Sequence, residues 1–128
     1  MNNRHTFNKT ERISFNREID CLFKQGETFI SYPLRIVYLE QMPNSRAKVS
    51  VLINVPKKKI KHAVERNRMK RLIREAYRLN KTSMIEYCNK KEVDLLIAFL
   101  FIGKKLYEWE EIEVSMKKVL NIIKERKE

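Results

Sequence analysis

At 128 residues, 43% of them hydrophobic, the chain has the length of one domain and enough apolar side chains for one core. Its 28 lysines and arginines exceed its 16 aspartates and glutamates, and the net charge of +12 favours a polyanionic partner, either nucleic acid or an anionic membrane surface. The longest apolar run, Leu95 to Ile102, is far shorter than the roughly 20 residues that span a bilayer, and no apolar segment follows the N-terminus as in a secretory signal, so we expect a cytoplasmic protein with no membrane partner.

Apolar spacing in the first part of the chain predicts one helix and two or three strands. Residues 15–25 repeat apolar side chains at helical spacing and are followed by Gly26, where a helix C-terminus favours glycine. Residues 34–40 are rich in Leu, Ile, Val and Tyr, and residues 47–55 alternate between apolar and polar positions, as half-buried strands do. An additional short strand is expected over 28–32.

The second part of the chain predicts two helices around one strand. A basic helix begins between Lys61 and Arg66 and ends near Asn80, and a polar connection follows it. Residues 93–102 are apolar on both faces, as expected of a central strand, and residues 109–124 form a final helix. We therefore expect an α+β fold in a single domain over residues 1–128, with a mixed sheet of about four strands, three helices, and a flexible tail at residues 1–9.

The positive charge is concentrated in one segment. Residues 57–81 hold 11 basic and 2 acidic side chains, whereas residues 1–56 hold 8 and 5, and residues 82–128 hold 9 of each. A surplus that served solubility alone would be scattered along the chain. The concentration indicates a binding surface.

The basic helix has two faces when it is projected at about 100° per residue. One face carries Met69, Leu72, Ile73 and Ala76 and is suited to packing on the sheet. The opposite face carries cations and one amide: Arg66, Asn67, Lys70, Arg71, Arg74 and Arg78. The planar fork of arginine suits bidentate contacts with phosphate and stacking on bases.

Such a face can also be simply solvated, as most charged helix faces are. Here it is nearly single-signed, with Glu75 and Glu65 as the nearby acids, and the resulting self-repulsion favours a binding role. Charge alone does not separate RNA from DNA, because contacts with phosphate carry no base information.

The segment from Ala63 to Ala76, centred on Arg66-Asn67-Arg68 and followed by Lys-Arg and Arg-Glu pairs, resembles the signature of the bacterial ribonuclease P protein subunit. The resemblance extends over nearly the whole chain. Residues 15–26 are similar to the family's first helix, residues 51–58 to its strand ending in paired lysines, and residues 93–102 to its last strand.

The resemblance implies a fold like the second domain of ribosomal protein S5, with a left-handed strand–helix–strand crossover that breaks the usual rule. It implies two partners, the catalytic ribonuclease P RNA and precursor tRNA, whose single-stranded 5′ leader enters a cleft between the first helix and the sheet. The RNA performs the hydrolysis with Mg²⁺, and the protein binds neither a cofactor nor a small-molecule substrate. No residue of the protein is then catalytic.

Charge and resemblance together predict the RNA-binding residues to be Lys57, Lys58, Lys61, Arg66, Asn67, Arg68, Lys70, Arg71, Arg74 and Arg78. Ile19, Phe23 and Val37 match positions of the leader cleft. Ile19 departs from the family, which favours a stacking phenylalanine there, and Tyr38 should face away from Val37 by strand alternation. Alternatively, Ile19 and Phe23 are plain core residues.

Motifs of a self-sufficient enzyme are missing from the sequence. Gly26 and Gly103 are the only glycines, so there is no glycine-rich phosphate loop, and His5 and His62 show no recognisable triad spacing. Cys21 and Cys88 are isolated and read as reduced structural cysteines. The glutamates at 108, 110, 111 and 113 complement a helix dipole and are not expected to bind a metal.

Two functions are alternatives to a ribonuclease P subunit. One is a ribosome-associated or general RNA-binding protein, and the other, more distant, is a metal-dependent nuclease.

Overall fold

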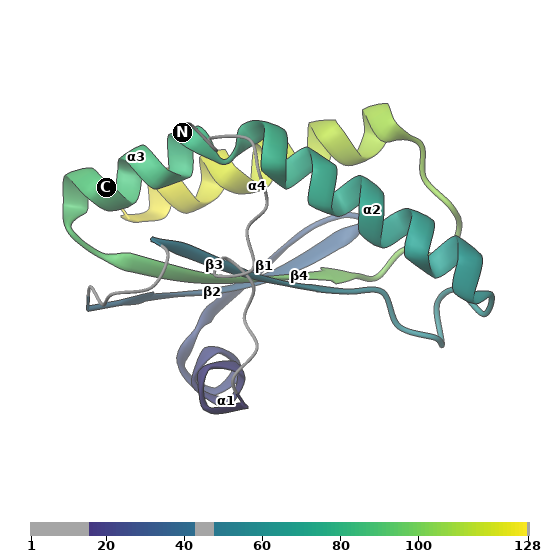
Figure 1. Cartoon of the computed structure of the whole chain (residues 1–128), viewed down its shortest axis with the longest axis horizontal. Helices are drawn as coiled ribbons and strands as arrows, with labels where there is room; N and C mark the ends of the chain where they lie inside the picture. The colour runs from purple at the N-terminus through teal and green to yellow at the C-terminus, as the bar shows by residue number, and fades with distance from the viewer. Residues whose placement is uncertain (1–15, 43–47, 128) are drawn as a thin grey trace, which may run out of the picture.

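The computed structural model describes residues 16–42 and 48–127, so the tail expected at residues 1–9 lies outside the described residues. One layer is a sheet, with α2, α3 and α4 on one face and α1 on the other (Figure 1). The elements in chain order are α1 (Asn16–Gln25), β1 (Glu27–Ser31), β2 (Leu34–Gln41), β3 (Val49–Asn54), α2 (Ala63–Asn80), α3 (Thr82–Lys91), β4 (Asp94–Phe101) and α4 (Trp109–Lys127). The expected α+β class is confirmed.

The sheet is mixed and has the strand order β1-β2-β4-β3. β1 pairs with β2 and β2 with β4 in antiparallel register, whereas β3 and β4 run parallel. β4 therefore lies inside the sheet with a strand on each side. It is apolar on both faces because alternate side chains enter the core under α2, α3 and α4 and the smaller cluster under α1. α2 and α3 connect the parallel pair, and the left-handed sense expected of this crossover stays a prediction.

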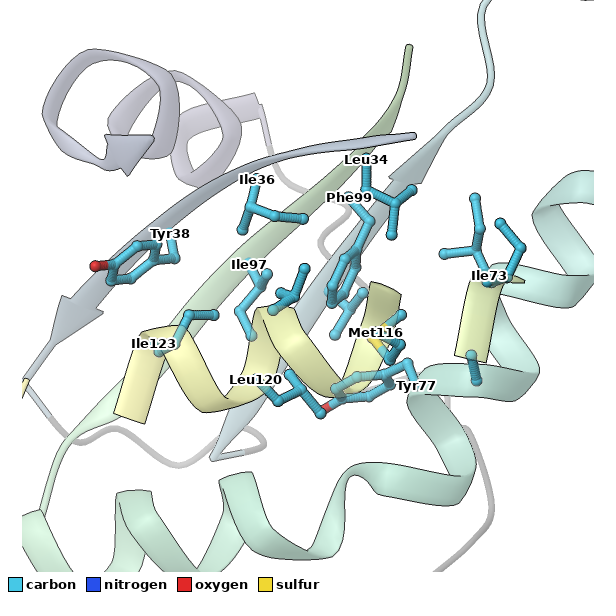
Figure 2. Close-up of a cluster of buried hydrophobic side chains, with 14 of the residues drawn as sticks. Leu34, Ile36, Tyr38, Ile73, Tyr77, Ile97, Phe99, Met116, Leu120 and Ile123 are labelled. Carbon is cyan, nitrogen blue, oxygen red and sulfur yellow. The ribbon is translucent and has the colours of Figure 1, made fainter. Parts of the chain in front are cut away.

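The larger core lies between the sheet and the three helices α2, α3 and α4. Alternate residues of β4, Ile97 and Phe99, are fully buried on this face, because strand side chains alternate between the two faces. Figure 2 shows them beside Met116 of α4 and Tyr77 of α2. Burial of each such side chain contributes roughly 1.5–3 kcal/mol, and this core fixes the orientation of α2.

The smaller core lies on the opposite face, beneath α1. Leu22 of α1 is buried there against Val37 of β2 and Leu96 and Ala98 of β4. At Gly26 the chain turns directly from α1 into β1, and a Cβ atom there would lie 2.9 Å from the carbonyl oxygen of Tyr38 and closer still to that of Leu22. Both neighbours are backbone atoms, so this close approach requires glycine.

The prediction of a polar connection after the basic helix is wrong, because this segment forms α3. The described residues therefore form four helices and not the three that were expected. Met84, Tyr87 and Cys88 of α3 are buried, at the helical spacing i, i+3 and i+4. The chain passes from α2 to α3 through Lys81, whose φ of −73° and ψ of −20° are helical. No glycine or proline marks that boundary.

The last helix begins as its sequence predicts. The backbone N–H of Glu108 donates to Oε1 of Glu111 at 3.2 Å, one half of a capping box. Glu111 therefore caps the helix, and Glu110 and Glu111 place negative charge in its first turn, where it complements the helix dipole.

Candidate nucleic-acid interface

α2 packs one face on the sheet and presents its basic face outward. Met69, Ile73, Ala76 and Tyr77 are fully buried, and Leu72 packs partly buried against them, which confirms the predicted core face. Along the opposite side, Asn67, Arg68 and Arg71 are exposed, whereas Arg66, Lys70, Arg74 and Arg78 are half-buried. Because the core face is fixed, the backbone positions from which the cations extend are fixed as well.

Arg66 also shapes the protein around it. Its Nη1 donates to the carbonyl oxygens of Ile60 at 3.1 Å and Lys61 at 2.7 Å. These bonds hold the connection between β3 and α2 against the first turn of the helix. Arg66 thus has a structural role besides the one predicted from its charge.

Two other arginines of the predicted set form ion pairs. Arg78 donates from Nε and Nη2 to the two carboxylate oxygens of Glu75, each at 2.9 Å. This hydrogen bonding holds the pKa of Glu75 below its usual value, so much of the charge of Arg78 is offset. Arg68 lies 3.5 Å from Oε2 of Glu108 in a pair that is largely exposed and worth little in free energy.

The lysines that precede α2 lie on the connection between β3 and α2, in which Ile60 is buried. Ile60 is only 6% exposed, and the backbone N–H groups of Lys59 and Ile60 donate to the carbonyl oxygen of Pro56 at 3.0 and 3.2 Å. Lys57, Lys58 and Lys61 project from this turn and are exposed. The structure therefore brings the lysines and the N-terminal half of α2 to one end of the sheet.

The three residues predicted for the leader cleft lie on the α1 side of the sheet but differ in burial. Val37 is 4% exposed in the smaller core, and Ile19 packs partly buried against it. Phe23 is 47% exposed, so it is not a core residue. Tyr38 is fully buried in the larger core on the other face, as strand alternation predicted.

Lys104 and Lys105 were missed by the sequence analysis, because they fall in the charge-neutral part of the chain. They follow β4, whose end lies beside that of β3: Asn54 of β3 is in register with Leu100. The lysines after both strands therefore reach the same end of the sheet. The sequence alone does not reveal this arrangement, because it depends on the pairing of β3 with β4.

Within residues 16–42 and 48–127, no helix is long and apolar enough to cross a membrane, and no three His, Cys, Asp or Glu side chains gather as metal ligands. Cys88 is buried and Cys21 half-buried, and both are free thiols. His62 is exposed directly before α2, whereas His5 lies outside the described residues.

This architecture defines a class of protein: a small α+β scaffold that holds an arginine-rich helix against its sheet and directs the basic face outward. Comparison with known proteins gives the family. The chain matches the family described as Ribonuclease P over residues 7–124. The chain belongs to the ribonuclease P protein family.

Individual relatives agree with this family. The ribonuclease P protein component of Porphyromonas gingivalis is 39% identical over 112 residues, which cover 88% of this chain and 82% of the relative. That of Chlorobium phaeobacteroides is 34% identical and covers 77% and 73%. Among solved structures, the ribonuclease P proteins of Staphylococcus aureus (TM-score 0.66, 24% identity, 88% and 94% coverage) and Thermotoga maritima (TM-score 0.63, 23% identity, 90% and 96% coverage) share the fold.

Proposed function

We propose that this protein component of ribonuclease P acts in tRNA processing by binding the catalytic RNA through α2 and the 5′ leader of precursor tRNA beside α1. Family membership supports the coarser assignment, a protein component of ribonuclease P. The observation that carries the finer one is the outward basic face of α2, whose opposite face is fully buried.

The proposed contact with the catalytic RNA uses residues that the protein holds in place. Arg71 and Asn67 are exposed on α2, and Lys70 and Arg74 are half-buried. Their backbone cannot move without disrupting the packing of Met69 and Ile73, so little backbone entropy is lost when RNA binds. Arginine forks on such a helix suit the phosphates of a folded RNA.

The proposed contact with the leader uses the sheet surface beside α1. The ring of Phe23 is half exposed and available for stacking on a base. Arg35 is exposed on β2 and shares the sheet face of Val37, because residues two apart in a strand point the same way. An aromatic ring and a cation on one face suit a single-stranded nucleic acid.

In this proposal the RNA subunit performs the hydrolysis with Mg²⁺ and the protein contributes binding alone. The protein then needs neither a catalytic residue nor a cofactor, and it acts in the cytoplasm on precursor tRNA. Its role is to raise the affinity of the ribonucleoprotein for substrates that still carry a leader.

A reconstitution experiment tests the proposal. Precursor tRNA with a labelled 5′ leader is incubated with Mg²⁺ and either the purified full-length protein, the cognate ribonuclease P RNA, or both. We expect the protein alone to leave the substrate intact, and we expect release of an intact leader when both components are present at low Mg²⁺. Efficient cleavage by the protein alone would overturn the proposal.

A second measurement addresses the alternative of a general RNA-binding protein. RNA that co-purifies with the tagged protein from its own cells is sequenced. Enrichment of ribonuclease P RNA supports the proposal, whereas enrichment of ribosomal RNA without it supports a ribosome-associated role.

A further inference from the structure

We propose that a pocket at one end of the sheet, outside both the basic face of α2 and the sheet surface beside α1, binds a backbone phosphate of RNA. The pocket has a volume of about 250 Å³ and is lined by the two connections β3–α2 and β4–α4. The inference rests on the proposed RNA-binding function and adds Lys104 and Lys105 to it.

The sheet topology creates this pocket. β3 and β4 are parallel neighbours and end side by side, so the segments that leave them begin at the same edge. Figure 1 shows both connections at the end of the sheet where α2 begins, on the right of the view. Segments about 45 residues apart in sequence, Lys59–His62 and Lys104–Leu106, therefore form the walls of one pocket.

The pocket is lined by cations from both walls. Lys59 and Lys61 come from the first connection and Lys104 and Lys105 from the second, while Glu65 is the one acid among the lining residues. All four lysines are exposed, so their ammonium groups stay hydrated and mobile enough to close on an anion. Lysines converging on a concave surface raise the local concentration of anions, and a phosphate is small enough to enter.

Three contacts hold the walls in place. The hydrogen bonds from Arg66 to the carbonyl oxygens of Ile60 and Lys61 fix the first wall. In the second wall, Nζ of Lys105 lies 5.1 Å from the ring centroid of Tyr107, a cation–π contact. The pocket is therefore largely preformed.

The surroundings favour the phosphate of a nucleic acid over a free anion. Tyr32 is 55% exposed, and its ring centroid lies 6.1 Å from that of Tyr107. An exposed ring and the ammonium of Lys105 thus contact the same residue. Both tyrosines lie outside the pocket lining, so a base stacked on the ring of Tyr32 would leave the pocket free for a phosphate of the same strand.

The experiment compares two lysine pairs that flank the same strand. The test variant is Lys104→Ala/Lys105→Ala, after β4, and the matched control is Lys90→Ala/Lys91→Ala, before it. Both pairs are exposed and each variant loses two charges. The eight residues of β4 separate the pairs by roughly 26 Å. Affinity for ribonuclease P RNA alone, for precursor tRNA alone and for inorganic phosphate is measured against salt concentration.

We expect the test variant to make the slope of log affinity against log salt shallower by about 1, as for the loss of one phosphate contact. The control should stay close to the wild type. The RNA for which the slope changes is the source of the phosphate. Lys104→Arg/Lys105→Arg should retain the wild-type slope, because it keeps the charge. All variants should show wild-type melting temperatures.

If the test and control variants have equal salt slopes with both RNAs, the pocket does not bind an RNA phosphate. The proposed function still stands in that case, as long as the wild type binds those RNAs. Saturable binding of inorganic phosphate without a change in either RNA slope also overturns the pocket as an RNA site, in favour of a free-anion site. A wild-type protein that binds neither RNA contradicts the proposed function itself.

Discussion

Arg66 has two roles, because it holds the preceding connection in place and lies on the predicted RNA-binding face. Comparing Arg66→Ala with Arg71→Ala separates them. The guanidinium of Arg66 bonds to two backbone carbonyls of the preceding connection. Arg71, five residues further along α2, is exposed. Both substitutions remove one charge from the basic face, but only that of Arg66 releases the connection.

The magnitudes follow from the contacts. Two hydrogen bonds from a partly exposed guanidinium contribute about 1–2 kcal/mol to folding in total, after solvent competition is taken into account. For a chain of 128 residues, 1 kcal/mol corresponds to roughly 4 °C in melting temperature. Arg66→Ala should therefore melt about 4–8 °C below the wild type, and Arg71→Ala within about 2 °C of it.

Affinity for ribonuclease P RNA should fall by roughly 1–3 kcal/mol in each variant, with a shallower salt dependence. Arg66→Ala should lose more than Arg71→Ala, because the lysines at 57, 58 and 61 lose their fixed position as well. Arg66→Lys keeps the charge without the two-carbonyl geometry. It should melt like Arg66→Ala and bind RNA better than that variant.

The assay combines thermal unfolding by circular dichroism with RNA binding at several salt concentrations. Equal melting temperatures of Arg66→Ala and Arg71→Ala would show that the contacts with the two carbonyl oxygens contribute nothing to stability. Unchanged salt slopes in both variants would show that α2 does not face the RNA.

Three further predictions concern α1 and the buried thiol. Gly26→Ala should destabilise the fold by about 1–3 kcal/mol, since a Cβ atom would collide with the carbonyl oxygens of Leu22 and Tyr38; urea unfolding measures this, and wild-type stability would show that the turn adjusts freely. Phe23→Ala should leave the melting temperature nearly unchanged because the ring is 47% exposed, while the preference for leader-bearing over mature tRNA falls by about 1–3 kcal/mol in competition binding; a large loss of stability with unchanged preference would contradict a leader role. Burial raises the pKa of Cys88 to about 12 from an ordinary 9.0, so iodoacetamide at pH 9 should alkylate Cys88 only after unfolding, as mass spectrometry would detect. Because the unfolded chain releases this proton first, stability should fall as pH rises from about 9 to 12, less steeply in Cys88→Ala; parallel pH profiles would argue against the raised pKa.

Local patterns in the sequence predicted most elements because their residues bury one face only. The apolar spacing of Met69, Ile73 and Ala76 and the alternation of Val49 and Val51 correspond directly to buried positions. α3 was missed for the opposite reason. Its buried stripe is three residues long and merges with α2, and its end is marked by Glu92 at a φ of 57°, where a glycine would have been expected.

The candidate site was predictable only where it is continuous in sequence. The basic face of α2 follows from spacing alone. The pocket at the end of the sheet joins Lys61 to Lys104, which requires the register of two parallel strands. Similarly, helical spacing placed Ile19 and Phe23 on one face of α1. Their different burial depends on where the sheet beneath α1 ends, and no local pattern contains that information.

The interior strand β4 has a consequence for how the two RNA partners would influence each other. Its side chains alternate between the core under α2 and the cluster under α1, so one strand separates the two proposed binding surfaces. If the proposed function holds, the two RNA partners would therefore bind to opposite faces of the sheet. We then expect substitutions that belong to different clusters, such as Phe23→Ala on α1 and Arg71→Ala on α2, to have additive free-energy effects on assembly.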